Sequence, residues 1–120
     1  MMHIRLLVVR SRNPEKLADF YRLFGLSFEY HKHGNSPFHY SASMGKTIFE
    51  IYPLTKGQSE PDINLRLGFD VENFSETIQK LKENDVTFFS EPSITNFGYM
   101  TIITDPDGRK IEVYDQHSIY

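Results

Sequence analysis

The chain contains no cysteine, and this absence excludes several kinds of chemistry together. Without thiols it forms no disulfide, no zinc–thiolate site and no cysteine nucleophile. A chain without cysteine also fits a reducing compartment, so we expect a cytoplasmic protein.

Positive charge and long apolar runs are scarce as well. Lys and Arg number 13 against 16 Asp and Glu, a formal net charge of -3, so we expect no nucleic-acid partner. The mean hydropathy of -0.44 argues against a membrane protein. The apolar run at residues 4–9 is too short for the core of a signal peptide, and it is broken by Arg5 and followed by Arg10.

The chain has enough apolar material for a folded interior. Of its 120 residues, 39% are hydrophobic and 14% aromatic, which suits one compact unit or two small modules that share a core. We treat the whole chain, residues 1–120, as a single domain.

One sequence pattern occurs twice along the chain. Phe-Glu-Ile-Tyr at residues 49–52 matches Ile-Glu-Val-Tyr at residues 111–114, and residues 6–11 match residues 66–71. Matches that keep their order and a nearly constant spacing indicate a duplicated module. The repeats cover about residues 4–53 and 64–115, and a polar linker at residues 53–63 joins them.

Each repeat predicts the element order β-α-β-β-β, and therefore an α+β fold. Asn13 and Pro14 are typical of a helix start, and Gly25 of a helix end. The expected strands are residues 4–9 (buried on both faces), 26–31, 38–43, 47–52, 64–71, 86–89, 98–104 and 110–114; the second helix is 75–84, and residues 91–95 are a loop. The helix residues Leu17, Phe20, Tyr21, Phe24, Ile78 and Leu81 are assigned to the core.

The most informative motif is Asp-Pro-Asp-Gly at residues 105–108, between the last two predicted strands. Proline fixes φ at one corner and glycine is free to take a positive φ, so the motif predicts the tip of a hairpin. We expect the carboxylates of Asp105 and Asp107 to accept hydrogen bonds from local backbone amides rather than to bind a ligand.

A duplicated β-α-β-β-β unit that ends in Asp-Pro-Asp-Gly-x-x-Ile-Glu resembles the vicinal oxygen chelate superfamily. That superfamily includes glyoxalase I, bleomycin- and fosfomycin-resistance proteins, and extradiol dioxygenases. The resemblance implies a curved mixed sheet, or half-barrel, with helices on its outer face and a small-molecule cavity inside. It also implies a homodimer, because a second subunit often completes the cavity or covers sheet edges in short members.

The resemblance also bears on metal binding. Catalytic members hold a divalent metal with a His or Gln from the first strand of each module and a Glu from the last strand of each. Glu50 and Glu112 match the two Glu, but the first-strand positions fall on Leu6 and Arg66, which do not bind metals. We therefore expect no metal cofactor.

These two glutamates are the candidate catalytic residues, and the alternative is that they are solvated hairpin positions. If Glu50 and Glu112 face one cavity, Arg66 between them would offset their charge and grip an anionic ligand; an exposed strand arginine is the alternative. His39 is a candidate to hydrogen-bond a ligand or to replace a missing metal ligand.

Aromatic residues complete the candidate ligand site. Tyr40, Phe97 and Tyr99 line a pocket or simply pack in the core. The other histidines are expected elsewhere: His3 on the wrong strand face, and His31, His33 and His117 in solvent.

Three functions follow from these residues. The first is a metal-free small-molecule-binding protein of the glyoxalase/bleomycin-resistance type. The alternative is a glyoxalase-I-like lyase or isomerase that uses Glu50 and Glu112, with His39 as a fallback ligand, and a divalent metal (Ni, Zn, Fe or Mn). A module that binds another protein is the third, and nothing in the sequence singles it out.

Overall fold

A computed structural model describes residues 1–118 of the chain. The chain divides into two compact units, Met1–Asp62 and Ile63–Tyr120, and each is described by itself. The first unit contains β1 (Leu6–Ser11), α1 (Pro14–Arg22), β2 (Glu29–His31), β3 (His39–Met44) and β4 (Thr47–Pro53). The second contains β5 (Leu67–Val71), α2 (Phe74–Glu83), β6 (Phe88–Thr95), β7 (Gly98–Thr104) and β8 (Lys110–Asp115).

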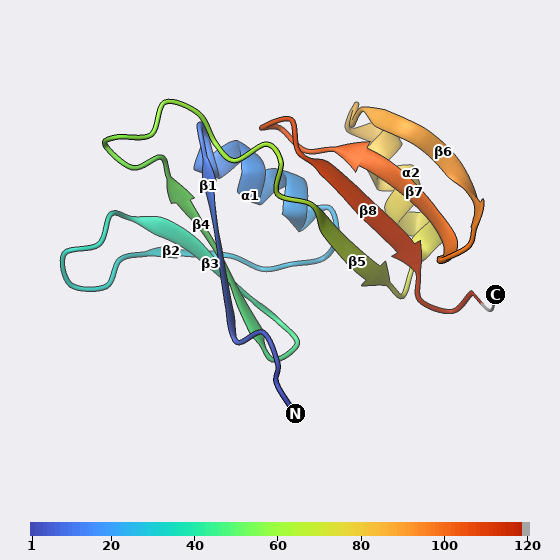
Figure 1. Cartoon of the computed structure of the whole chain (residues 1–120), viewed down its shortest axis with the longest axis horizontal. Coiled ribbons are helices and arrows are strands. Elements are labelled where there is room, and N and C mark those ends of the chain that lie inside the picture. The colour runs from blue at the N-terminus through green and yellow to red at the C-terminus, as the bar shows by residue number, and fades with distance from the viewer. Residues whose placement is uncertain (119–120) are drawn as a thin grey trace. The chain divides into compact units, whose positions relative to one another are not determined.

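The first unit is a mixed sheet of four strands in the order β1-β4-β3-β2, with α1 on one face (Figure 1). β1 and β4 are parallel, and the other neighbours are antiparallel. Between sheet and helix lies a closed core in which Leu17, Phe49 and Ile51 are fully buried. Burial of this apolar surface is the main force that holds the helix on the sheet.

The second unit repeats this topology, with its strands in the order β5-β8-β7-β6. Strand register repeats as well, because Val8 lies opposite Glu50 in the first sheet and Gly68 lies opposite Glu112 in the second. The α+β class and the tandem β-α-β-β-β architecture predicted from the sequence are thus confirmed. Both sheets are open, so each leaves two edge strands.

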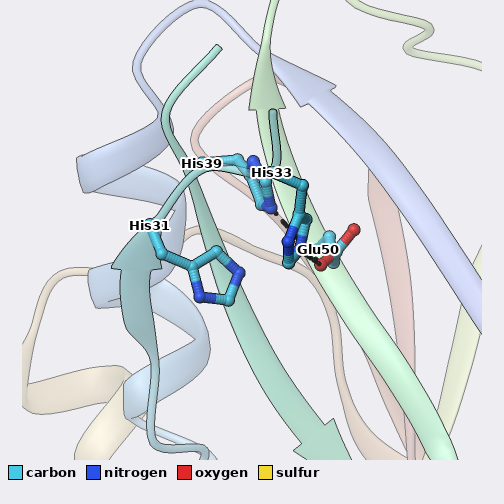
Figure 2. Close-up of side chains that lie close together, drawn as sticks. All are labelled: His31, His33, His39 and Glu50. Carbon is cyan, nitrogen blue, oxygen red and sulfur yellow. Dashed lines mark ion pairs between the residues drawn. The ribbon is translucent and has the colours of Figure 1, made fainter. Parts of the chain in front are cut away.

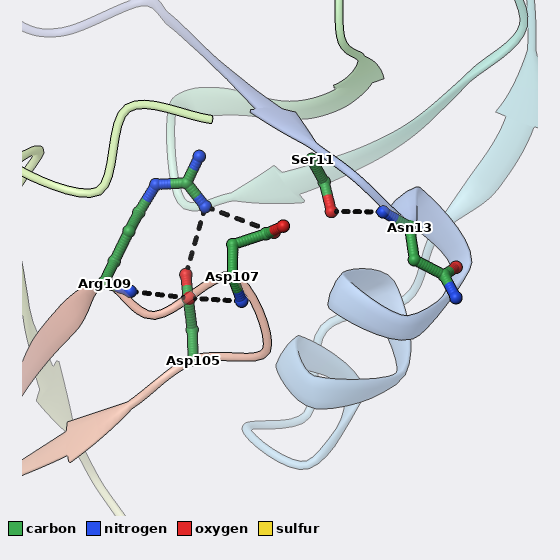
Figure 3. Close-up of polar contacts among 5 residues, drawn as sticks. All are labelled: Ser11, Asn13, Asp105, Asp107 and Arg109. Carbon is green, nitrogen blue, oxygen red and sulfur yellow. Dashed lines mark hydrogen bonds and ion pairs between the residues drawn. The ribbon is translucent and has the colours of Figure 1, made fainter. Parts of the chain in front are cut away.

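Local sequence signals explain how the first helix begins and ends. The side chain of Asn13 accepts a hydrogen bond from the amide of Lys16 at 3.1 Å, and Pro14 occupies the first turn, where no amide hydrogen is needed. The amide of Asn13 in turn donates to the Ser11 hydroxyl at 3.1 Å (Figure 3). After the helix, Gly25 takes a φ of 93°, which a residue with a side chain rarely adopts.

The predicted hairpin tip between β7 and β8 is also present (Figure 3). Asp105 Oδ1 accepts hydrogen bonds from the amides of Asp107 at 2.8 Å and Arg109 at 3.0 Å, as expected for turn chemistry. The guanidinium of Arg109 adds ion pairs to Asp105 at 3.2 Å and to Asp107 at 3.4 Å. All three side chains are buried, so the turn contains a charged cluster that is shielded from water.

Two details of the predicted strands are wrong. The first strand is not buried on both faces, because Leu6 and Val8 are 54% and 37% exposed on the face that α1 does not cover. Residues 91–95 are not a loop but continue β6, whose pairing with β7 shifts register twice. β6 is an edge strand, and such bulges together with an unpaired side let it accommodate Pro92.

Within residues 1–118, neither helix has the length and apolar character needed to cross a membrane.

Candidate functional site

Strand alternation places functional side chains on the sheet face opposite the helix. In β4, Phe49 and Ile51 face the core, so Glu50 between them points to the other face. The register of β2, β3 and β4 places Ser41 opposite Glu50, and His31 opposite His39. His39 lies two residues from Ser41 in β3, so its side chain is on the same face as Glu50. His31, opposite His39 in edge strand β2, lies on this face as well.

A cluster of three histidines and one glutamate forms on this face (Figure 2). One ligating atom from each of His31, His33, His39 and Glu50 lies within 4.8 Å of the others. The Nε2 atoms of His39 and His33 lie 3.4 and 3.9 Å from Glu50 Oε2. We refer to these four residues as the His–Glu cluster.

His39 is held rigidly at the centre of the cluster. Its side chain is fully buried, and its Nδ1 lies 3.0 Å from the carbonyl oxygen of Pro37. A carbonyl only accepts, so Nδ1 carries the proton and donates it. The ring stacks on Tyr52 with centroids 4.1 Å apart and an interplanar angle of 8°, and the Arg10 guanidinium covers the tyrosine ring at 4.7 Å.

Two buried nitrogens of the cluster lack a hydrogen-bond partner within the described part of the chain, Nε2 of His31 and Nε2 of His39. An unsatisfied buried polar group costs about 1–3 kcal/mol, so binding of a further group by these two nitrogens would be favourable. On the far side of its ring, His31 Nδ1 faces the Glu29 carboxylate at 3.8 Å.

The expectation that His31 and His33 are simply solvent-exposed is wrong for His31, whose side chain is 34% exposed and lies in β2. His33, at 66%, is exposed as expected, yet it reaches Glu50. The sequence analysis names His39 and Glu50 as candidate ligands but not His31 and His33, although the sequence contains a signal for these two. His-Lys-His in a strand or its extension places both histidines on one face.

The second unit presents a different arrangement at the matching glutamate. Arg66 donates from Nε to Glu112 Oε2 at 2.8 Å, and the Tyr114 hydroxyl donates to Glu112 Oε1 at 2.6 Å. The hydrogen bond to Glu112, with some desolvation, raises the pKa of the Tyr114 phenol above its ordinary value. Both carboxylate oxygens are thus occupied, and the Arg66 side chain remains 47% exposed.

A shallow hollow lies beside this arrangement, with a volume of about 310 Å³. It is lined by Gly68, Phe69, Asp70, Phe97 and Tyr114. A Cβ at Gly68 would make ordinary van der Waals contact with Glu112 and Tyr114 at 3.7 Å. Ligand pockets range from about 300 to 1,000 Å³, so the hollow suits a small molecule or part of a larger one.

The remaining sequence candidates lie apart from both places. Tyr99 packs edge-to-face on Phe74 of α2, with ring centroids 5.4 Å apart. Tyr40 contacts the rings of Phe28 and Tyr30, and burial raises its pKa. The roles of Tyr40 and Tyr99 in ligand binding, and a cavity shared by Glu50 and Glu112, stay predictions.

Comparison with known families identifies the chain as a member of the Glyoxalase/Bleomycin resistance protein/Dioxygenase superfamily, whose sequence profile matches residues 3–113. This confirms the resemblance inferred from the duplicated motif. No curated protein matches the chain in sequence.

Solved structures share the fold at low sequence identity. TnmS3, an antibiotic binding protein from Streptomyces sp. CB03234, is 22% identical with a TM-score of 0.77, covering 96% of each chain. A superfamily member from Sphaerobacter thermophilus is 18% identical with a TM-score of 0.74, covering 96% of this chain and 98% of its own. The oxidase ChaP-H2 is 12% identical with a TM-score of 0.75, covering 93% and 91%.

Proposed function

We propose that this chain binds a small organic molecule with an anionic group, and that Arg66 provides the contact to that group. The Arg66–Glu112 pair carries the proposal. Glu112 accepts hydrogen bonds from Arg66 and from Tyr114. The resemblance to the superfamily implies that Arg66 stands at a sequence position where catalytic members carry a metal ligand. A metal ion held by the ligand pattern of the family would therefore lie next to the positive charge of Arg66 instead of a ligand atom, and like charges repel.

The guanidinium has capacity for a ligand. Only Nε binds Glu112, and the terminal amino groups form no hydrogen bond within residues 1–118. Two such groups in a fixed plane bind a carboxylate or phosphate in bidentate fashion. The apolar part of the molecule would occupy the neighbouring hollow, whose walls include Phe97 and Tyr114. That the similar structure TnmS3 binds an antibiotic supports a binding role.

The test is a thermal-shift screen of small carboxylates and phosphates on the full chain, followed by calorimetry of each hit. We expect Arg66→Ala to weaken binding by about 10- to 150-fold, since a charged hydrogen bond contributes about 1.5–3 kcal/mol. Lys82→Ala is the matched control, because Lys82 is 50% exposed and pairs with Glu91 at the same 2.8 Å. Equal affinity of the two variants for every hit would refute the role of Arg66, and affinity lost with chelator would refute metal-free binding.

A second candidate is a glyoxalase-I-like lyase or isomerase. The proximity of Glu50 and His39, 3.4 Å apart in a buried place, favours it. Such an enzyme uses a glutamate to move a proton on a metal-polarised substrate. Turnover of thiol adducts with added Ni²⁺, Zn²⁺, Fe²⁺ or Mn²⁺, abolished by both Glu50→Gln and Glu112→Gln, would establish it in place of the binding function.

We also propose a cytoplasmic homodimer. Each open sheet has two edge strands, which are sites for uncontrolled pairing unless another chain or segment covers them. Exposed apolar side chains of Leu6, Val8 and Ile48 on neighbouring strands of the first sheet add to this surface. Sedimentation at micromolar concentration should give a dimer, and a pure monomer would contradict the proposal.

A further inference from the structure

We propose that His31, His33, His39 and Glu50 bind one divalent transition-metal ion, and that Zn²⁺ suits this donor set best. This site shares Glu50 with the ligand pattern of the superfamily but replaces the other three ligands of that pattern with histidines. Three of its four donors come from β2, β3 and the segment between them, and all four lie in the first unit.

The donor types define the class of ion. Three imidazole nitrogens and one carboxylate oxygen match the ligands that Zn²⁺ takes in tetrahedral geometry. Imidazole also suits Cu, Fe and Ni, whereas Mg²⁺ and Ca²⁺ prefer oxygen ligands throughout. The ion proposed is therefore a first-row transition metal rather than a hard cation.

The four ligating atoms lie within 4.8 Å of one another, and one pair already has the spacing of a metal site. Two ligands at about 2.1 Å from a tetrahedral ion lie about 3.4 Å from each other. His39 Nε2 and Glu50 Oε2 already have that separation of 3.4 Å. His33 Nε2, at 3.9 Å from the same oxygen, must approach by about half an ångström. Its side chain is exposed, so this movement meets little resistance from packing.

The protonation of His39 gives an independent reason to place a cation here. Because Nδ1 donates to Pro37, neutral His39 directs the Nε2 lone pair toward the Glu50 carboxylate. Two lone pairs that face each other repel unless a cation or a proton lies between them. His31 Nε2 is a second buried nitrogen that lacks a partner in the part of the chain the structure describes.

The outer contacts are those of metal-binding histidines. Such residues usually donate their second ring nitrogen to a carbonyl or carboxylate, which fixes the ring and its tautomer. For His39 this partner is the Pro37 carbonyl at 3.0 Å. The Glu29 carboxylate lies 3.8 Å from Nδ1 of His31, which is an ion-pair distance and too long for a hydrogen bond. Stacking on Tyr52 fixes the plane of the His39 ring.

The predicted consequence is structural. Four protein ligands complete a tetrahedral shell, which is the pattern of structural rather than catalytic zinc. A bound ion would tie the β2–β3 connection, through His33, to Glu50 of β4. We therefore expect Zn²⁺ to raise the melting temperature of the chain as well as to bind it.

The experiment uses the full chain, treated with chelator and exchanged into metal-free buffer. Zn²⁺ titration by calorimetry should give one ion per chain, and bound Co²⁺ should show the strong visible absorption of tetrahedral coordination. His31→Gln and His33→Gln should each weaken Zn²⁺ binding by at least about tenfold, since even loss of an outer-shell partner costs about 10- to 100-fold.

The matched control replaces His3 and His117, both exposed and outside the cluster, with Gln. It should bind Zn²⁺ like the natural chain, and circular dichroism should show all variants folded. The proposal is overturned if His31→Gln and His33→Gln retain full affinity, or if the control loses as much. It is also overturned if the natural chain binds no Zn²⁺. Nitrogen NMR that finds His39 protonated at Nε2 would then show that a proton, rather than a metal ion, joins His39 to Glu50.

Discussion

Replacing Arg109 with Met tests how strongly charge pairing inside the last β-turn supports the second unit. Arg109 is 1% exposed, and its Nη1 lies 3.2 Å from Asp105 and 3.4 Å from Asp107. Methionine keeps much of the apolar stem but removes the cation. Two buried carboxylates then remain without their shared partner.

Loss of one member of a buried ion pair costs about 3–5 kcal/mol, a large part of the total stability of about 5–15 kcal/mol. Lys82→Met is the control, because it removes an exposed ion pair of 2.8 Å that is worth about 0–1 kcal/mol. The exposed pair is the shorter one, so the comparison separates the effect of burial from that of distance.

The loss of stability caused by Arg109→Met should depend on pH. Burial raises the pKa of the Asp105 carboxyl above its ordinary 3.8, while hydrogen bonds and charge from Arg109 lower it. Because the folded pKa is the higher one, the folded state gains stability from this group below pH 3.8 and loses it as pH rises through the folded pKa. Arg109→Met keeps the backbone amide that donates to Asp105 but removes the charge and the side-chain hydrogen bond of Arg109, so the pKa of Asp105 rises further and the loss of stability extends to higher pH. Destabilisation should therefore be smaller near about pH 4 than at about pH 7.

Urea unfolding followed by circular dichroism or tyrosine fluorescence measures the effect, since the chain has no tryptophan. The midpoint is compared between the natural chain and both variants at each pH. A cost for Arg109→Met no greater than that for Lys82→Met, or one that does not change with pH, would refute the reasoning.

Two further predictions concern single hydrogen bonds. Asn13→Ala should lower the free energy of unfolding in urea by about 0.5–2 kcal/mol, because the Asn13 side chain caps α1. Asn73→Ala should lower it by less, since Asn73 starts α2 without a side-chain cap bond. Equal losses for the two variants would contradict the capping argument. Tyr114→Phe should reduce the loss of stability above pH 10, because the bond to Glu112 raises the pKa of this phenol and the folded state holds its proton in that range. Alkaline unfolding curves that coincide for Tyr114→Phe and the natural chain would contradict this.

Several features could be predicted from the sequence because their causes are local. Asn13 and Pro14 start a helix, and the Asp-Pro-Asp-Gly turn closes a hairpin, through contacts among neighbouring residues. The duplicated motifs around Glu50 and Glu112 indicated the repeat, and the repeat predicted that both sheets have the same topology. Edge strand β6 was mispredicted since its bulges depend on pairing with β7, which no local pattern encodes.

The sequence by itself determined the superfamily and the order of elements, and it predicts a departure from the metal ligands of the superfamily at Leu6 and Arg66. These follow from residue types at fixed spacings. Only the tertiary structure decided that His31, His33 and His39 meet at Glu50, and that Arg66 binds Glu112. The reason is physical: strand register sets which distant side chains share a face, and register depends on the packing and hydrogen bonding of the whole sheet.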